Sequence, residues 1–219
     1  MVTPRAFRVN NQVASLIDSS EPPLYARYVQ HIRRILLEDL ALSDRDILVL
    51  GAGGFTLSHR EPANRYTYVD IDPAIRAIVE RDFLREPARG EFIATDARRY
   101  VADTGQRYDA VVVDVYSSRT SIPGHLVTRE FWRDTRRALK PGGALLANLI
   151  LDGRLESPYA RNLLATIESA YGRCAVEVLY KSAPRSNVIV TCFAGTHAEP
   201  TRIYVDERNQ ADIDSARSP

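Results

Sequence analysis

The sequence predicts a doubly wound α/β fold, with a mostly parallel seven-stranded sheet and helices on both faces. Short β-rich runs alternate with helical stretches from residue 46 to residue 171, as expected for parallel strands joined by helical crossovers. The run at 47–50 is apolar throughout, which indicates a strand buried on both faces. Two more β-rich runs, at 174–180 and 187–193, predict a C-terminal hairpin with one strand antiparallel to the rest.

The remaining elements follow from apolar periodicity and from turn residues. Strands are expected at 46–50, 65–70, 91–94, 108–114 and 144–151. Helices are expected at 24–40, near 54–60, and at 73–84, 96–103, 128–139 and 157–171. The first helix follows Glu21-Pro-Pro23 and should cover one face of the sheet. Residues 1–23 are expected to be irregular, with at most a short strand at 13–17.

These elements predict three parts of the chain. Residues 1–45 form a short N-terminal segment with its covering helix, and residues 46–196 form one α/β domain. Residues 197–219 are polar with few aliphatic side chains, so we expect a poorly ordered tail. A chain of 219 residues is long enough to bury one substantial core.

Composition argues against several classes of partner. The 29 basic and 28 acidic residues give a net charge of +1, and therefore no electrostatic case for nucleic acid or a membrane surface. No apolar run approaches the roughly 18 residues that span a bilayer, and the N-terminus lacks the apolar segment of a signal peptide. Cys174 and Cys192 lie on neighbouring predicted strands, so a bridge is conceivable. Two buried free thiols in a cytoplasmic protein are the expectation.

The first strand leads directly into Gly51-Ala-Gly53-Gly54, where a chain can turn sharply and let a ligand approach its backbone. Asp70 closes the second strand. In nucleotide-binding folds, a ribose-binding carboxylate lies about 20 residues beyond such a glycine loop, and Asp70 fits this spacing. A nicotinamide dinucleotide is disfavoured, because Thr56 stands where the third glycine of that fingerprint belongs. The alternative is a tight turn without a ligand. Asp72 precedes Pro73 and is expected to cap the next helix.

Two later carboxylates also end strands. Asp96 follows the third strand and can cap the helix 96–103. Asp114 ends the buried run 110–114, where poor solvation should raise its pKa. The polar loop after it, which carries Tyr116 and Ser117, can shape a substrate pocket. The alternative for Asp114 is a buried carboxylate that binds backbone amides.

Other catalytic classes lack support. The four histidines show no metal-ligand spacing with one another or with the cysteines, so no metal is predicted. No serine lies in a G-x-S-x-G turn, which argues against a triad hydrolase.

The order of these features resembles the layout of S-adenosylmethionine (AdoMet)-binding Rossmann-like domains. Strands two, three and four are each followed by a carboxylate, and Lys140-Pro-Gly-Gly143 precedes strand five. The resemblance covers about residues 46–151. It implies that Gly51, Gly53 and Gly54 pack against the amino-acid portion of the donor. Asp70 would then hold both ribose hydroxyls beside Ile71. Asp96 and Ala97 would read the adenine edge.

A narrower resemblance rests on clustered motifs. These are Val69-Asp-Ile-Asp-Pro73, Thr95-Asp-Ala97, Tyr108-Asp-Ala-Val-Val-Val-Asp114 and Leu126-Val-Thr-Arg-Glu-Phe-Trp132. Together with the glycine loop and the Lys140 turn, they are similar to the polyamine aminopropyltransferases, the spermidine synthases. The resemblance implies transfer of an aminopropyl group from decarboxylated AdoMet to a small-molecule amine, with methylthioadenosine as the other product. Asp114 matches the position of the family's general base, and Gln12, Tyr25 and Tyr180 match its substrate-binding positions.

Two positions depart from the family pattern. The family carries an acid at the place of Gly54, where it grips the donor amine, and a second Asp at the place of Ser117. Each lost charged hydrogen bond is worth about 1.5–3 kcal/mol, so affinity for a polyamine and for decarboxylated AdoMet should fall. Intact AdoMet is therefore an alternative donor, for methyl transfer or a related reaction. In either case Asp114, Tyr116 and Ser117 would line the acceptor pocket.

Two expectations complete the sequence-based picture. A catalytically silent nucleoside-binding module that regulates a partner is a further alternative. The N-terminal region is short beside that of the family, and the apolar helix 24–40 and the end strand leave room for a homodimer.

Overall fold

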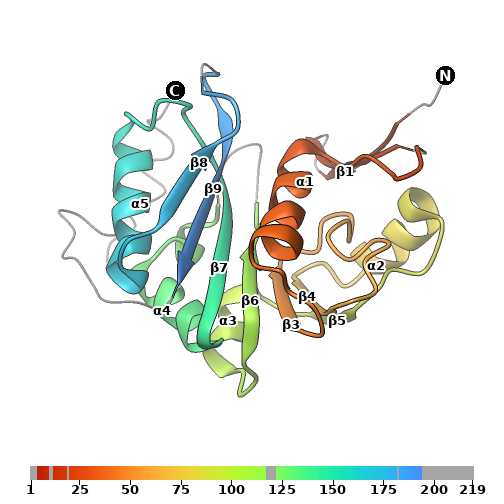
Figure 1. Ribbon diagram of the computed structural model, residues 1–219, viewed down its shortest axis with the longest axis horizontal. Helices are drawn as coiled ribbons and strands as arrows, with labels where there is room; N and C mark the ends of the chain where they lie inside the picture. Colours follow the sequence, from red (N-terminus) through yellow and green to blue (C-terminus); the bar gives the residue numbers. More distant parts are fainter. Residues whose placement is uncertain (1–3, 10–11, 19, 117–121, 182, 194–219) are drawn as a thin grey trace.

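The computed structural model describes all residues except 1–3, 10–11, 19, 117–121, 182 and 194–219. The main strands are β3 (Asp46–Leu50), β4 (Arg65–Asp70), β5 (Glu91–Ala94), β6 (Tyr108–Val113), β7 (Leu139–Leu151), β8 (Ala175–Val178) and β9 (Ser186–Phe193). They form one seven-stranded sheet in the order β5–β4–β3–β6–β7–β9–β8, drawn in Figure 1.

Strand direction follows the prediction. The pairs β3–β4, β3–β6, β4–β5 and β6–β7 are parallel, whereas β9 is antiparallel to both β7 and β8. β3 has no exposed residue after Asp46, because its uniformly apolar side chains meet helices on both faces. The predicted doubly wound fold with a C-terminal antiparallel pair is confirmed.

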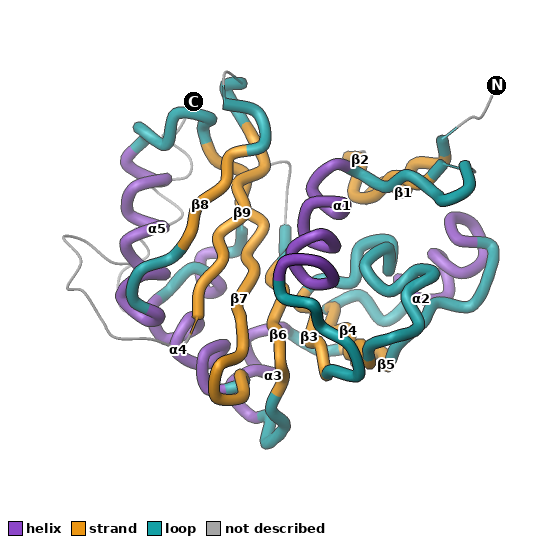
Figure 2. Tube along the Cα trace, viewed as in Figure 1, coloured by secondary structure: helices purple, strands orange, loops and turns teal. Residues whose placement is uncertain are grey.

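The helices cover both faces of this sheet, as Figure 2 shows. They are α1 (Arg27–Arg34) continued by η1 (Ile35–Asp39), α2 (Ile75–Ile78) continued by η2 (Val79–Leu84), α3 (Ala97–Asp103), η3 (Gly124–Leu126), α4 (Arg129–Arg137) and α5 (Pro158–Tyr171). One buried cluster joins α1, η1 and η2 to one face, and a second joins α3, α4 and α5 to the other. Within the described residues, no helix combines the length and apolar character needed to cross a bilayer.

The N-terminal segment is more regular than predicted. β1 (Arg5–Val9) and β2 (Gln12–Ile17) form an antiparallel hairpin, where only a short strand at 13–17 was expected. The hairpin packs against η2 through Phe7, whose ring centroid lies 5.7 Å from that of Phe83. Sequence periodicity could not show this contact, because Phe7 and Phe83 are distant in the chain.

The short helix predicted near 54–60 is wrong. This stretch is a series of turns, with positive φ at Phe55 and Arg60. Arg33 of α1 replaces the missing helical hydrogen bonds, since its guanidinium donates to the carbonyls of Leu57 and His59 at 2.5 and 3.1 Å. Its side chain therefore holds the turn that follows the glycine loop.

The expectation of two free thiols is also wrong. Cys174 and Cys192 form a disulfide, with Cα atoms 4.5 Å apart. Ala175 pairs with Thr191 in antiparallel register, so the preceding Cys174 lies opposite the following Cys192. Disulfides persist mainly in oxidising compartments, so the thiol-based argument for a cytoplasmic location no longer stands.

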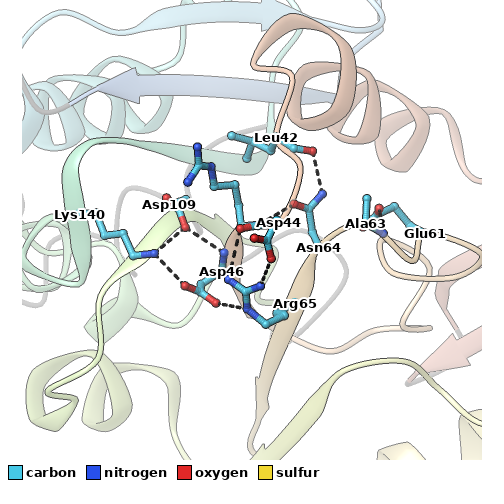
Figure 3. Close-up of polar contacts among 10 residues, drawn as sticks. Leu42, Asp44, Asp46, Glu61, Ala63, Asn64, Arg65, Asp109 and Lys140 are labelled. Carbon is cyan, nitrogen blue, oxygen red and sulfur yellow. Dashed lines mark hydrogen bonds and ion pairs between the residues drawn. The ribbon is translucent and has the colours of Figure 1, made fainter.

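Charged side chains tie the strands together at the amino edge of the sheet (Figure 3). Lys140 Nζ lies 2.7 Å from a carboxylate oxygen of both Asp46 and Asp109. Arg65 Nε lies 2.6 Å from Asp46 and its guanidinium also pairs with Asp44. The backbone amide of Asp46 donates to Asp109 at 2.9 Å. The network thus joins the first residues of β3, β4, β6 and β7.

We predict that Asp109→Asn destabilises the fold at neutral pH by about 1 kcal/mol, because it weakens a charge-assisted hydrogen bond to Lys140. Burial acts to raise the pKa of Asp109, but Lys140 and the Asp46 amide outweigh it and lower the pKa. The stabilisation is therefore present above the unfolded-state pKa of about 3.9 and is lost as the pH falls through the lower folded-state pKa. Urea unfolding at neutral and at acid pH measures the difference.

The control for this prediction is Asp103→Asn, an exposed carboxylate with only a 3.9 Å contact to Arg99. It should change the free energy of unfolding little at either pH. An Asp109→Asn effect that persisted unchanged at acid pH would contradict the electrostatic explanation.

Candidate active site

The candidate site lies where the strand order reverses, between β3 and β6. β4 and β5 extend the sheet on one side of β3, and β6 and β7 extend it on the other. In open α/β sheets, ligands bind at the carboxyl ends of the strands at such a switch point. Here the end of β3 leads into Gly51 and the end of β6 leads into Asp114, and Asp114 N donates to Leu50 O at 2.8 Å.

Gly51 is required by both backbone conformation and space. Its φ is +91°, and a Cβ there would lie 2.2 Å from the carbonyl oxygen of Asp114. The first glycine therefore lets the loop after β3 touch the loop after β6 directly.

Gly54 has a different neighbour, the N-terminal hairpin. A Cβ at this position would lie 2.5 Å from Phe83 Cε1 and 2.7 Å from Ser15 Cβ. The Gly54 amide donates to Ser15 Oγ at 3.0 Å, and Ser15 is only 1% exposed. Any side chain at Gly54 would thus displace the hairpin or η2. Gly53, at φ +48°, lies beside the same serine.

Asp70 ties the end of β4 to the glycine loop. One carboxylate oxygen accepts from Ala52 N at 2.8 Å and the other from Asp72 N at 3.0 Å. A carboxylate has about four acceptor positions, so two remain for ligand hydroxyls. Ile71 beside it is 74% exposed and offers an apolar surface at the same edge. Asp72 accepts from Ala74 N at 2.9 Å in the turn before α2. The helix begins only at Ile75, with Ala74 as its N-cap and no side-chain cap bond, so the prediction that Asp72 caps a helix 73–84 is wrong.

Asp96 caps α3, accepting from Arg99 N at 3.0 Å, and Ala97 behind it is buried. Its second carboxylate oxygen lies 3.1 Å from Nε2 of His125, which η3 supplies. Burial acts to raise the pKa of Asp96, but the Arg99 amide and His125 outweigh it and lower the pKa. The capping role is therefore observed, and adenine recognition stays a prediction.

Asp114 is the centre of a polar network. Asn148 Nδ2 of β7 donates to one carboxylate oxygen at 2.8 Å, and the hydroxyl of Tyr28 in α1 hydrogen-bonds to the carboxylate as well. Burial raises the pKa of Asp114 to about 6, although Asn148 and Tyr28 each act to lower it. This agrees with the expected effect of poor solvation at a strand end.

Asn148 is itself held in place. Asn187 Nδ2 of β9 donates to Asn148 Oδ1 at 3.0 Å, and Tyr116 donates through its hydroxyl to Asn148 O at 2.6 Å. The contact with Asn187 orients the Asn148 side-chain amide so that its Nδ2 faces Asp114. Burial and the nearby Asp114 carboxylate raise the pKa of Tyr116 well above its usual value, so this hydroxyl stays protonated.

Tyr28 connects Asp114 to the glycine loop. Its hydroxyl hydrogen-bonds to Ser15 as well as to Asp114, and Ser15 in turn accepts from Gly54. A continuous chain of hydrogen bonds therefore runs from the loop after β3, through the hairpin and α1, to the end of β6.

The predicted substrate-binding residues are less closely grouped. Tyr25 hydrogen-bonds through its hydroxyl to His59 Nδ1 at 2.7 Å, which ties it to the turn after the glycine loop. Tyr180 is 44% exposed, and the guanidinium of Arg27 lies over its ring at 5.0 Å. Gln12 pairs with Val9 at the start of β2. Ser117 lies outside the described residues.

Five residues of the site were missed by sequence reasoning: Ser15, Tyr28, His125, Asn148 and Asn187. Asn148 carries a usable signal, because it is a lone amide inside the apolar run 144–151. Tyr28 carries none, since it fits the apolar stripe of its helix. Ser15, His125 and Asn187 become significant only through contacts across the fold.

A cavity of about 700 Å³ lies at the opposite, amino edge, lined among others by Arg65, Arg89, Arg107 and Tyr108. Its size does not make it the site, because the convergent carboxylates and the glycine loop lie at the carboxyl edge. No cluster of three potential ligand side chains among the described residues is arranged to hold a metal, and the prediction of no metal stays a prediction.

The fold and the site define a doubly wound protein of the methyltransferase-fold class. The chain superimposes on a probable spermidine synthase from Corynebacterium glutamicum with a TM-score of 0.63, 18% identity and coverage of 90% of this chain and 78% of that one. It also matches an N-methyltransferase from Bradyrhizobium japonicum, in complex with S-adenosylhomocysteine, at a TM-score of 0.53 and 12% identity over 77% and 86% of the two chains.

Sequence comparison gives a more specific similarity. The chain is 31% identical over 171 residues to a polyamine aminopropyltransferase of Vibrio vulnificus, which covers 74% of this chain and 54% of that protein. No protein-family model matches the chain. The chain is thus a homologue of the polyamine aminopropyltransferases, and the predicted resemblance is confirmed. It spans about half the length of these curated relatives.

We predict that Gly51→Ala destabilises the fold by about 2–4 kcal/mol, through backbone strain at positive φ and the overlap with Asp114. Gly142→Ala is the matched control, because Gly142 also has a positive φ but has nothing within 4 Å of its virtual Cβ. It should cost about 1 kcal/mol from strain alone. Urea unfolding of both variants measures the difference, and equal losses would contradict the close approach of the two loops.

Proposed function

We propose that the protein transfers an aminopropyl-type group from a sulfonium nucleoside to a small amine, with Asp114 as the general base. The observation that carries the proposal is the position of Asp114. Asp114 directly follows β6 at the switch point, and its backbone contacts the glycine loop. Curated relatives are named polyamine aminopropyltransferases, which supports this reaction class.

The residues at the carboxyl edge fit a nucleoside donor. Asp70 retains acceptor capacity for two ribose hydroxyls, and Ile71 offers an apolar surface beside it. Gly51 and Gly53 leave backbone without side chains where the donor tail would pass. When bound, such a donor supplies a carbon made electrophilic by the adjacent sulfonium.

Asp114 would handle the proton of the acceptor. An alkyl amine has a pKa near 10, so at neutral pH it must lose a proton before it can act as a nucleophile. With a pKa of about 6, Asp114 is mostly ionised at neutral pH and can accept that proton. Tyr28 and Asn148 would hold its carboxylate in one orientation. Holding both reactants in place supplies much of the remaining rate acceleration.

The donor is the finer question. An acid at Gly54 would grip the amine of decarboxylated AdoMet, but a Cβ there would lie 2.5 Å from Phe83 and 2.7 Å from Ser15. The groups contacting this part of the loop are neutral, so they offer no anion to bind the amine of decarboxylated AdoMet. Intact AdoMet is therefore a second candidate donor. Methyl transfer then becomes the alternative reaction, in keeping with the methyltransferase-like fold.

Calorimetric titration tests the donor site. Methylthioadenosine should bind to the wild-type protein, and Asp70→Ala should weaken binding by at least about 50-fold, because two charge-assisted hydrogen bonds are lost. Asp72→Ala is the control, since its backbone amide still reaches Asp70. Titration with AdoMet and with decarboxylated AdoMet then identifies the donor. Absence of binding by the wild type would reject the nucleoside site. Tight binding without turnover over a broad amine panel would favour the silent module.

The pH dependence of transfer tests the base. Activity should rise with pH through about 6 as Asp114 loses its proton. Asn148→Ala removes a hydrogen bond that lowers this pKa, so the rising limb should move to higher pH. Rates measured from about pH 5 to pH 8 locate the limb. An unchanged limb in the variant would contradict the role of Asp114.

A further inference from the structure

Side-chain contacts join α1 to β8 and to the segment that follows it. Tyr28 of α1 touches the Asp114 carboxylate, and the adjacent Arg27 lays its guanidinium over the ring of Tyr180 at 5.0 Å. The α1–β8 contact continues with His31 and Glu177, 3.2 Å apart. Arg27 and Tyr180 therefore join α1 to the segment after β8, one residue from the tyrosine that contacts Asp114.

The site contains few negative charges. The side chains that hydrogen-bond to Asp114 are Asn148 and Tyr28, and the titratable groups that sense its charge are tyrosines. Carboxylates of neighbouring segments are engaged elsewhere: Asp18 accepts from Leu24 N at 2.8 Å, Asp152 from Glu156 N at 2.9 Å, and Glu177 pairs with His31 and Arg34. Asp114 is thus the single carboxylate of the described site that is placed to meet an acceptor.

The rim of the site carries positive charge instead. Arg27 is exposed, and within the described residues no carboxylate lies within ion-pair distance of it. The turn between β8 and β9, which follows Tyr180, adds the exposed Lys181 and Arg185. A second ammonium group on an acceptor would meet like charge at this rim. A carboxylate would instead pair with a planar guanidinium that an aromatic ring already holds.

We propose that the acceptor is an amine whose far end carries a carboxylate, and that Arg27 is the residue that selects it. This inference rests on the proposed transfer reaction. The acceptor nitrogen forms a bond to the donor carbon as the carbon–sulfur bond breaks. The sulfur keeps the electron pair and leaves in the nucleoside thioether, and the nitrogen's proton passes to Asp114. Arg27 takes no part in these bonds and acts on the choice of acceptor.

Matched acceptors test the proposal. Putrescine and γ-aminobutyrate have similar length and differ at the far end, as do cadaverine and δ-aminovalerate. Release of the nucleoside thioether, measured with both donors, should show kcat/KM at least about ten-fold higher for each amino acid than for its diamine. Arg27→Gln should remove most of that preference, and Arg27→Glu should reverse it. Arg133→Gln, an exposed arginine of α4, should leave the ratio unchanged.

The ratio between acceptors separates selection from a merely structural role, because general damage lowers both rates together. Preference for the diamines in the wild type, or a ratio that Arg27 variants do not change, would overturn the inference and leave the transferase assignment standing. No product from any acceptor with either donor would overturn the assignment itself, and this inference with it.

Discussion

The contact between Gly51 and the carbonyl of Asp114 determines how the site is built. Two parallel strands end side by side, and the chain leaves each in a different direction, so their following loops meet only if one of them lacks a side chain. This approach places a glycine-rich backbone directly against the loop that carries the reactive carboxylate. Asp70 joins the same junction, because its carboxylate accepts from Ala52 N of the glycine loop.

The N-terminal hairpin completes the junction from outside the α/β core. Ser15 fills the space that a side chain at Gly54 would need, and it joins the glycine loop to Tyr28 by hydrogen bonds. Asp114 is therefore held from two directions, by Asn148 within the sheet and by Tyr28 from the covering helix. The same surrounding segments bury Asp114 and thereby raise its pKa. Folding of the N-terminal hairpin is therefore linked to the protonation of this carboxylate.

Much of the fold was accessible from the sequence, because buried parallel strands leave uniform apolar runs and their ends carry distinctive residues. Gly51 and Asp114 were recognised because each follows such a run, and Asp70 and Asp96 because each lies at the end of a more mixed β-rich run. The contributions of Ser15 and Tyr28 were not, since their roles arise from contacts between segments that no local pattern connects. A helix was predicted for the turns at 54–60, because local sequence does not show that the distant Arg33 side chain hydrogen-bonds to their carbonyls.

The disulfide has a bearing on how samples of this protein are compared. It closes a loop with a sequence separation of 18 that contains β8, Tyr180 and Asn187. Asn187 sets the orientation of Asn148, which donates to Asp114. A thiol reductant added during purification would loosen one end of that chain of contacts, with a cost to stability of about 3 kcal/mol for a loop of this length. Batches with different redox histories are then mixtures of two species, and their activities should be compared only after the thiol content of each has been measured.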